Sequence, residues 1–115
     1  TMKRLSMICS QWDVVSVPFP FTDKTEAKRR PALVLSKTAF NRGGHTVLTM
    51  ITTRGHRPWP GDSEIEDYSA AGLKLRCQVR LKIFTLDNRL LLRKIGCLSK
   101  NDSKKVRQHL YHFFF

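Results

Sequence analysis

The sequence predicts a small, mainly β domain, a twisted barrel of about five short strands followed by one α-helix. Runs rich in Val, Ile, Leu and Thr are short, and loops that contain Gly and Pro separate them. Apolar residues recur at helical spacing only near the end of the chain. A chain of 115 residues suffices for one hydrophobic core, so we expect residues 1–115 to form a single domain.

Composition and hydrophobic period predict each strand. We expect strands at 13–17, 31–36, 46–53, 77–84 and 90–98, with a short edge strand at 63–66. In 77–84, Val79, Leu81 and Ile83 alternate with Gln78, Arg80 and Lys82, which predicts a half-buried strand with a cationic polar face. Glycine and asparagine at 41–44 predict a turn between the second and third of these strands.

The helix is predicted by its start signal and its apolar spacing. Ser99 is followed three residues later by Asp102, an approximate capping box. Apolar residues then follow at helical spacing: Val106, Leu110 and Phe113 or Phe114. Earlier in the chain, 67–71 predicts one or two helical turns that end at Gly72 in a left-handed conformation.

The charge is strongly positive, with 21 Lys and Arg against 9 Asp and Glu, a net charge of +12. Such an excess favours polyanions or acidic peptides as partners. A membrane surface would also attract it, but no apolar run approaches the ~18 residues of a spanning helix. The apolar part of 1–10 is too short for a signal peptide, so we expect this segment to be a tag remnant or a flexible extension.

The three cysteines, Cys9, Cys77 and Cys97, are widely spaced and form no metal-binding or disulfide pattern. We therefore expect free thiols in a reducing cytoplasm, no metal and no cofactor. Any chemistry would then rest on side chains alone.

The stretch KRRPALVLS places Lys28, Arg29 and Arg30 directly before Pro31 and an aliphatic strand. One interpretation is a solvated loop end. The other is that Pro31 fixes the backbone so that Arg30 projects from a rigid strand toward an anionic ligand.

Eight runs in order identify a family resemblance: DVVSVPFPFTD, RRPALVLS, AFN, MIT, WPGD, AAGL, VRLKIFTLD and LRKIGCLS. Between about Trp12 and Val106 the chain resembles the MazF/PemK toxins of type II toxin–antitoxin systems. The resemblance implies an SH3-like barrel of the MazF/CcdB type, a homodimer, and metal-independent, sequence-specific cleavage of single-stranded RNA. It also implies a cognate antitoxin whose acidic tail blocks the RNA groove.

The resemblance further implies catalytic roles for Arg30, in RRP, and Thr52, in MIT. Cleavage through the 2′-OH needs positive charge at the crowded phosphorane, and an arginine fork supplies it. Thr52 would position the phosphate or relay a proton. The alternative interpretation is that Arg30 is only a solvated cation and Thr52 only a β-branched strand residue without a catalytic role.

Further residues are candidates for binding RNA: Lys28, Arg29, Thr53, Arg54, Arg57, Trp59 and Arg80. The cations would attract phosphates, and Trp59 would stack on an unpaired base. His56 is a possible general acid or base, although most loop histidines merely face water. Surface charge is the alternative for Arg80, and core packing is the alternative for the aromatic residues near the loops.

The chain departs from the family at two positions. The family usually has Gly where this chain has Trp12, and in one branch an Asp stands at the position of Lys82. These departures keep two other functions open. One is a toxin of the same fold that poisons a protein such as DNA gyrase, and the other is a catalytically weakened RNA-binding module.

Overall fold

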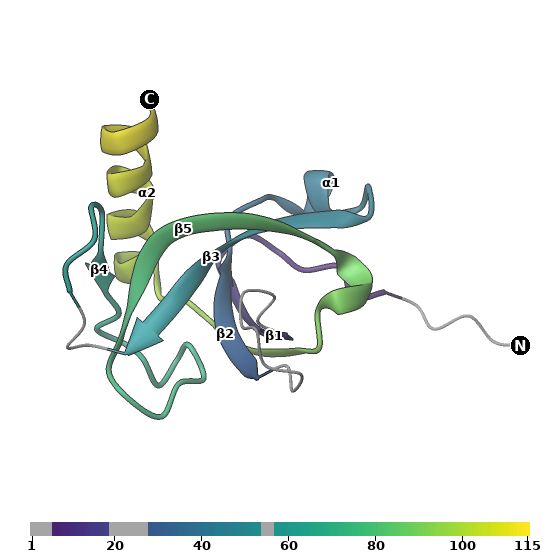
Figure 1. Cartoon of the computed structure of the whole chain (residues 1–115), viewed down its shortest axis with the longest axis horizontal. Coiled ribbons are helices and arrows are strands. Elements are labelled where there is room, and N and C mark those ends of the chain that lie inside the picture. Colours follow the sequence, from purple (N-terminus) through teal and green to yellow (C-terminus); the bar gives the residue numbers. More distant parts are fainter. Residues whose placement is uncertain (1–5, 19–27, 54–56) are drawn as a thin grey trace, which may run out of the picture.

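The computed structural model describes residues 6–18, 28–53 and 57–115, and within these ranges it is mainly β with a C-terminal helix (Figure 1). Its elements are β1 (Asp13–Pro18), β2 (Arg29–Val34), α1 (Thr38–Asn41), β3 (His45–Thr53), β4 (Ser63–Glu64), β5 (Cys77–Asp87), η1 (Asn88–Leu90), β6 (Arg93–Cys97) and α2 (Lys100–Phe114).

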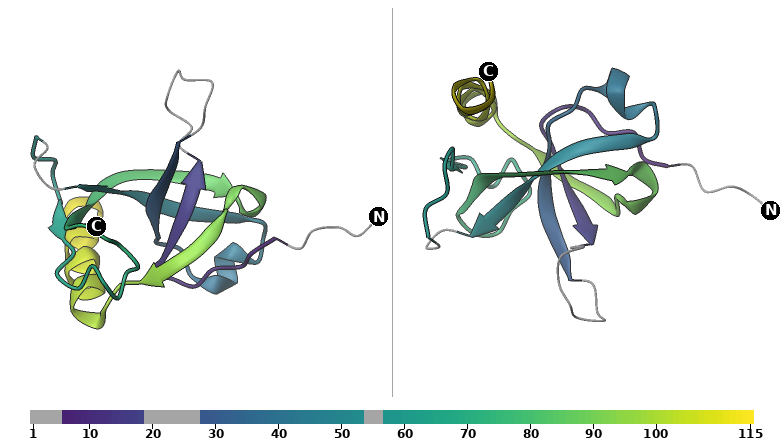
Figure 2. Two further views of the ribbon diagram at one scale, coloured as in Figure 1. Left: turned by 90° about the horizontal axis from the view of Figure 1, so that it is seen from below. Right: turned by 45° about the horizontal axis from the view of Figure 1, so that its top comes forward.

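The strands form one antiparallel sheet in the order β4-β5-β3-β2-β1-β6. Figure 2 shows the sheet curling so that β6 and β5 lie on opposite sides of the bend. This half-barrel, with α2 beside the β4 end of the sheet, confirms the predicted fold class.

The curl buries both faces of the central strands. Val14 and Leu33 point into a first cluster under α2, where they join Val79 and Val106. Their neighbours on the opposite face enter a second cluster inside the curl, made of Val15, Val17, Ala32, Val34, Leu48, Leu86 and Leu91. Continuous apolar runs such as those of β1 and β2 are what strands buried on both faces require. Met7 and Cys9, from the segment expected to be an extension, also pack against the second cluster.

The predicted burial of β5 is wrong at Arg80 and Ile83. The β3–β5 register shifts between Thr49 and Met50, and two residues of β5, Leu81 and Lys82, have no partner in the described ladder. This bulge bends the strand, but its two extra residues leave the alternation in phase, so Val79 and Ile83 still share a face. The buried face changes along β5, because Val79 packs in the first cluster whereas Phe84 and Leu86 pack in the second. Ile83 is therefore 41% exposed, whereas Arg80, expected on the polar face, is only 9% exposed.

The loop after β2 contains a short helix that the sequence did not predict. α1 precedes the expected turn, and buried Asn41 holds it by donating to the carbonyls of Cys9 (2.8 Å) and Ser36 (3.1 Å). Asn88 donates in turn to the Asn41 carbonyl at 2.7 Å. Because η1 occupies 88–90, β6 begins at Arg93 and not at residue 90 as predicted.

Helix α2 begins as predicted, since the Ser99 hydroxyl accepts from the Asp102 amide at 3.1 Å. The Asp102 carboxylate instead accepts from the amides of Glu66 (3.1 Å) and Asp67 (3.0 Å) and lies 3.4 Å from Lys105 Nζ. Burial acts to raise the pKa of Asp102, but these donors and Lys105 outweigh it and lower the pKa. The carboxylate therefore ties α2 to the segment that follows β4.

Trp12, immediately before β1, has a φ of +75°. This is the left-handed region that favours glycine, which the resembling family usually has at this position. The ring packs against the first cluster, and that burial offsets a backbone cost of about 1 kcal/mol.

Candidate functional site

Arg30 and Thr52 lie at neighbouring strand ends. Arg30 pairs with Val17 of β1, and the β2–β3 ladder pairs Ala32 with Met50. Continuing that register by two residues brings Arg30 opposite Thr52, on the same face of the sheet. Arg30 is exposed and Thr52 is half-buried. The topology therefore places Arg30 and Thr52 at adjoining ends of β2 and β3, and a contact between the guanidinium and the hydroxyl stays a prediction.

Pro31 gives Arg30 a stiff base. It pairs with Ser16 in β1, whereas pairing toward β3 begins only at Ala32. The N–H that proline lacks is therefore not required by β3, and the residue is accommodated inside a six-stranded sheet. With φ fixed by the ring, the backbone on the C-terminal side of Arg30 is held in place.

Four of the predicted RNA-binding residues lie near this end of the sheet. Lys28 and Arg29 stand at the start of β2, while Thr53 ends β3 and Arg57 follows it, all four exposed. Because β2 and β3 are antiparallel, the start of one adjoins the end of the other. Two of the predicted residues, Arg54 and His56, lie outside the described residues.

Arg80 has a different environment from these exposed cations. Its Nε and Nη2 donate to the two carboxylate oxygens of Asp62 at 3.2 and 3.1 Å, and Nη2 also donates to the Arg57 carbonyl at 2.7 Å. The side chains of Arg80 and Asp62 are only 11% and 17% exposed. This geometry makes Arg80 an anchor of the 57–62 loop, and a direct contact with RNA stays a prediction.

The sequence analysis did not identify Asp62 as a residue of the site. Besides pairing with Arg80, its carboxylate accepts from the Trp59 amide at 2.9 Å, and its own amide donates to the Trp59 carbonyl at 3.1 Å. One acid therefore holds the loop closed on itself and attached to β5.

Trp59 is presented by this loop and is 40% exposed. Its indole Nε1 donates to the Leu81 carbonyl at 3.3 Å, and Lys82 Nζ lies 4.5 Å from the ring centroid. Lys82, at the position where one branch of the family has Asp, therefore covers one face of the ring through a cation–π contact. Any base that stacks on Trp59 would use the other face.

The thiols and acids of the described residues offer no further reactive centre. Burial raises the pKa of both Cys9 and Cys77, which disfavours the thiolate, and Cys97 is exposed. Among the described residues, no group of three or more His, Cys, Asp or Glu is arranged to hold a metal ion. No helix in the same part of the chain has the length and apolarity needed to cross a membrane.

Solved structures define the class of small toxin that this fold resembles. MazF from Deinococcus radiodurans matches with a TM-score of 0.70 at 22% identity, covering 92% of this chain and 96% of that one. The Mycobacterium tuberculosis toxin MazF-mt6 matches with a TM-score of 0.70 at 18% identity, covering 87% and 93%. A mycobacterial endoribonuclease in complex with its cognate antitoxin matches with a TM-score of 0.70 at 19% identity, covering 91% of each chain.

At these identities the likeness shows the fold, and the family follows from the sequence. Residues 10–114 match the model of the PemK-like, MazF-like toxins of type II toxin–antitoxin systems. The chain belongs to this family, as the eight runs in its sequence indicated. A direct sequence comparison with curated proteins gives no match.

Proposed function

We propose that the protein is the toxin of a type II toxin–antitoxin module and acts as a metal-independent, sequence-specific endoribonuclease on single-stranded RNA. The observation that carries this proposal is the β2–β3 register, which, extended by two residues, puts Arg30 and Thr52 on one face at the adjoining ends of the two strands. The net charge of +12 and the exposed cations around these two residues suit a polyanionic substrate.

The reaction divides between substrate and protein. The 2′-oxygen of one nucleotide attacks the adjacent phosphorus, and the bond from phosphorus to the 5′-oxygen breaks. The 2′-OH loses its proton and the leaving 5′-oxygen gains one, which gives a cyclic 2′,3′-phosphate and a 5′-hydroxyl. Arg30 stabilises the charge on the phosphorane, and the Thr52 hydroxyl positions the phosphate or relays a proton.

The surrounding residues hold the strand in place. Lys28, Arg29 and Arg57 attract phosphates without regard to sequence, while the free face of Trp59 stacks on a base. The loop geometry fixed by Asp62 and Arg80 then governs which bases fit beside the scissile bond.

Two protein partners belong to the proposal. A cognate antitoxin with an acidic tail would occupy the same basic face and exclude RNA. A second copy of the chain would form a homodimer, which is supported by exposed aromatic rings at the end of α2: Tyr111, Phe113, Phe114 and Phe115.

The test incubates the purified protein with a long unstructured RNA in EDTA and maps both new ends. We expect cyclic phosphate and 5′-hydroxyl ends at a defined sequence, and Arg30→Ala should cleave about 10²–10³-fold more slowly. Arg42→Ala is the matched control, because Arg42 is also exposed but follows α1, at the far end of β3 from Thr52.

Three results would contradict the proposal. Cleavage that requires added metal, or full activity of Arg30→Ala, would remove its mechanism. Growth arrest with intact cellular RNA would indicate a poison of a protein such as DNA gyrase. Salt-dependent RNA binding without cleavage would indicate a weakened binding module.

A further inference from the structure

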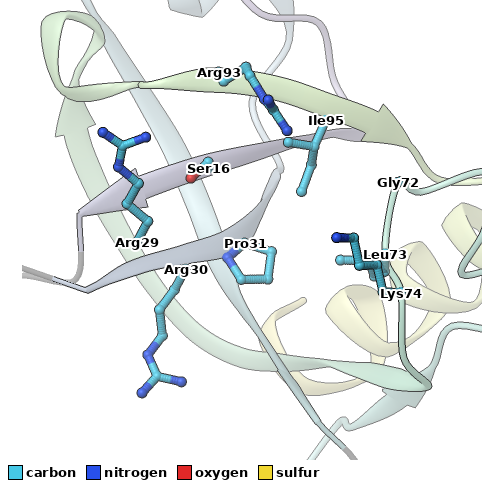
Figure 3. Close-up of a pocket in the computed structure, with 9 residues that line it drawn as sticks. All are labelled: Ser16, Arg29, Arg30, Pro31, Gly72, Leu73, Lys74, Arg93 and Ile95. Carbon is cyan, nitrogen blue, oxygen red and sulfur yellow. The ribbon is translucent and has the colours of Figure 1, made fainter.

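A pocket of about 370 Å³ lies beside the start of β2, and Arg30 is itself among the residues that line it. Its lining includes Ser16 of β1, Arg29 and Pro31 of β2, Arg93 and Ile95 of β6, and Lys74 from the segment before β5. In Figure 3 the side chain of Arg30 leaves β2 away from Ser16 and Arg93, whereas that of Arg29 extends toward their side. Successive residues of a strand point to opposite faces, so the side chains of Arg29 and Arg30 extend to different sides of β2 although both residues line the pocket.

The charge of the pocket has one sign. Arg29, Lys74 and Arg93 come from three separate segments, all are exposed, and no acidic residue lines the pocket. Among the described residues, none of these three cations lies in a salt bridge, although the next residue of β6, Lys94, pairs with Asp13 at 3.2 Å. Cations that converge without an acid repel one another, and a bound anion relieves that repulsion.

The wall that carries Lys74 is fixed by a contact between two glycines. Gly72 has a φ of +76°, and a Cβ there would lie 1.8 Å from the Ile95 carbonyl oxygen. A Cβ on Gly96 would lie 2.3 Å from the Ala71 carbonyl carbon, and the Cys97 amide donates to the Ala70 carbonyl at 3.3 Å. Backbone therefore packs on backbone, which holds the 70–74 segment against β6 and gives the pocket a defined width.

The floor of the pocket is apolar. Pro31, Ile95 and Leu73 line it, and the half-buried hydroxyl of Ser16 lies between the strands. Figure 3 shows Lys74 and Arg93 on opposite sides of Ile95. Several cations and a hydroxyl over a short apolar surface suit a group that carries a phosphate beside a flat, weakly polar ring. The volume falls within the usual range for small-ligand pockets, roughly 300–1,000 Å³.

We propose that this pocket binds one nucleotide of the RNA strand outside the scissile linkage, an inference that rests on the proposed ribonuclease function. Its phosphate pairs with Arg29, Lys74 and Arg93, and its ribose or base lies on Pro31 and Ile95. Arg29 and Arg30 are consecutive. An RNA strand bound by Arg30 therefore has to bend only around the start of β2 to reach the side on which Arg29 lies. An arginine fork matches a phosphate in two hydrogen bonds, which favours a nucleotide over the single carboxylates of an acidic peptide.

The test removes two pocket charges outside the proposed catalytic site. The double variant Lys74→Gln/Arg93→Gln is compared with Lys100→Gln/Arg42→Gln, which removes the same two charges from exposed positions away from the pocket. The probe is a fluorescein-labelled single-stranded RNA with 2′-deoxyribose at the mapped cleavage position, so that it binds without being cut. Circular dichroism and urea unfolding verify that both variants are folded, and Lys74→Gln alone is the substitute if the double variant is not.

We expect the pocket variant to bind the long RNA about 10-fold more weakly, and its slope of log affinity against log salt to fall by about 0.7, one single-strand phosphate contact. The loss should vanish when the RNA is trimmed from one end to the few nucleotides around the cleavage position. Cleavage of that short RNA should keep its wild-type rate.

Other results overturn the inference without touching the proposed function. Equal losses in the two double variants would assign the effect to net charge alone. An unchanged salt slope with a changed dimer dissociation constant would show that a second copy covers the pocket. A variant that escapes only an acidic antitoxin peptide would show a protein-binding site. Failure of the wild-type protein to cleave any RNA would, by contrast, overturn the proposed function itself.

Discussion

Arg80 and the arginines at the start of β2 show how one basic chain uses the same side chain in two ways. Arg80 is 9% exposed and satisfied by Asp62 and the Arg57 carbonyl, whereas Arg29 and Arg30 are exposed at the end of a strand. A buried guanidinium requires a counter-charge, because desolvation otherwise costs several kcal/mol. An exposed guanidinium has no such need and remains accessible to a ligand. The chain has only 9 Asp and Glu for 21 Lys and Arg, so few cations can have an acidic partner. Burial therefore distinguishes Arg80, which has a structural role, from Arg29 and Arg30, which are candidates for binding a ligand.

The strongest way to break this comparison is to remove the acid from the buried pair. We expect Asp62→Ala to lower the free energy of unfolding by about 3–5 kcal/mol, because Arg80 is left buried without its partner. Urea unfolding measures the change. Asp87→Ala is the control, since its partner Arg89 is 78% exposed, and it should cost much less, although Asp87 also caps η1. Equal effects from the two substitutions would mean that burial does not distinguish these pairs.

A smaller effect concerns the buried carboxylate of Asp102, whose pKa is lowered in the folded protein. Its stabilisation is fully present above the unfolded pKa, about 3.9, and is lost as pH falls through the lower folded pKa, because the unfolded chain takes up the proton first. Asp102→Asn should cost about 1–2 kcal/mol at pH 7 and flatten the fall in stability below about pH 4.

Thermal or urea unfolding at a series of pH values measures both quantities. An Asp102→Asn protein that loses stability with acid as steeply as the wild type would show that other carboxylates dominate this range.

The smallest expected effect concerns Lys82, an exposed cation whose partner is the ring of Trp59 and not an acid. Lys82→Gln should cost about 0.5–1 kcal/mol, the value of a cation–π contact at a partly exposed site. A double-mutant cycle with Trp59→Leu isolates the coupling between the two side chains. No coupling would mean that Lys82 is as free for a ligand as Arg29.

The sequence predicted the strands well because their apolar runs leave little choice. Residues 13–17 and 46–53 consist largely of β-branched residues, and they form strands to within one residue of the predicted bounds. The burial of Arg80 and the exposure of Ile83 were missed because the two ends of β5 are covered on different faces, by the first and the second cluster, and the sequence of one strand does not show this. A signal for Asp62 was nevertheless present, since an arginine among Val79 and Leu81 calls for an acid when that strand is buried.

The candidate site was predicted only in part, for a topological reason. Arg30 and Thr52 carry local motifs, and pairing between consecutive strands brings them together. The pocket lined by Arg29, Lys74 and Arg93 has no such motif, because its cations come from segments that are far apart in the sequence, such as β2 and β6. Only the curl of the sheet and the Gly72–Gly96 contact join them, and neither has a signature in any short window of sequence.

The Gly72–Gly96 contact also offers a way to change the shape of this pocket by mutation. A side chain at either glycine would push the 70–74 segment off β6, moving Lys74 away from Arg93. Residue 72, which lines the pocket, and residue 96, which does not, would thus set the size of the ligand that the pocket admits. A library randomised at residues 72 and 96, with compensating changes at Ile95, is therefore a route to toxins with altered substrate preference that leaves the chemistry at Arg30 intact.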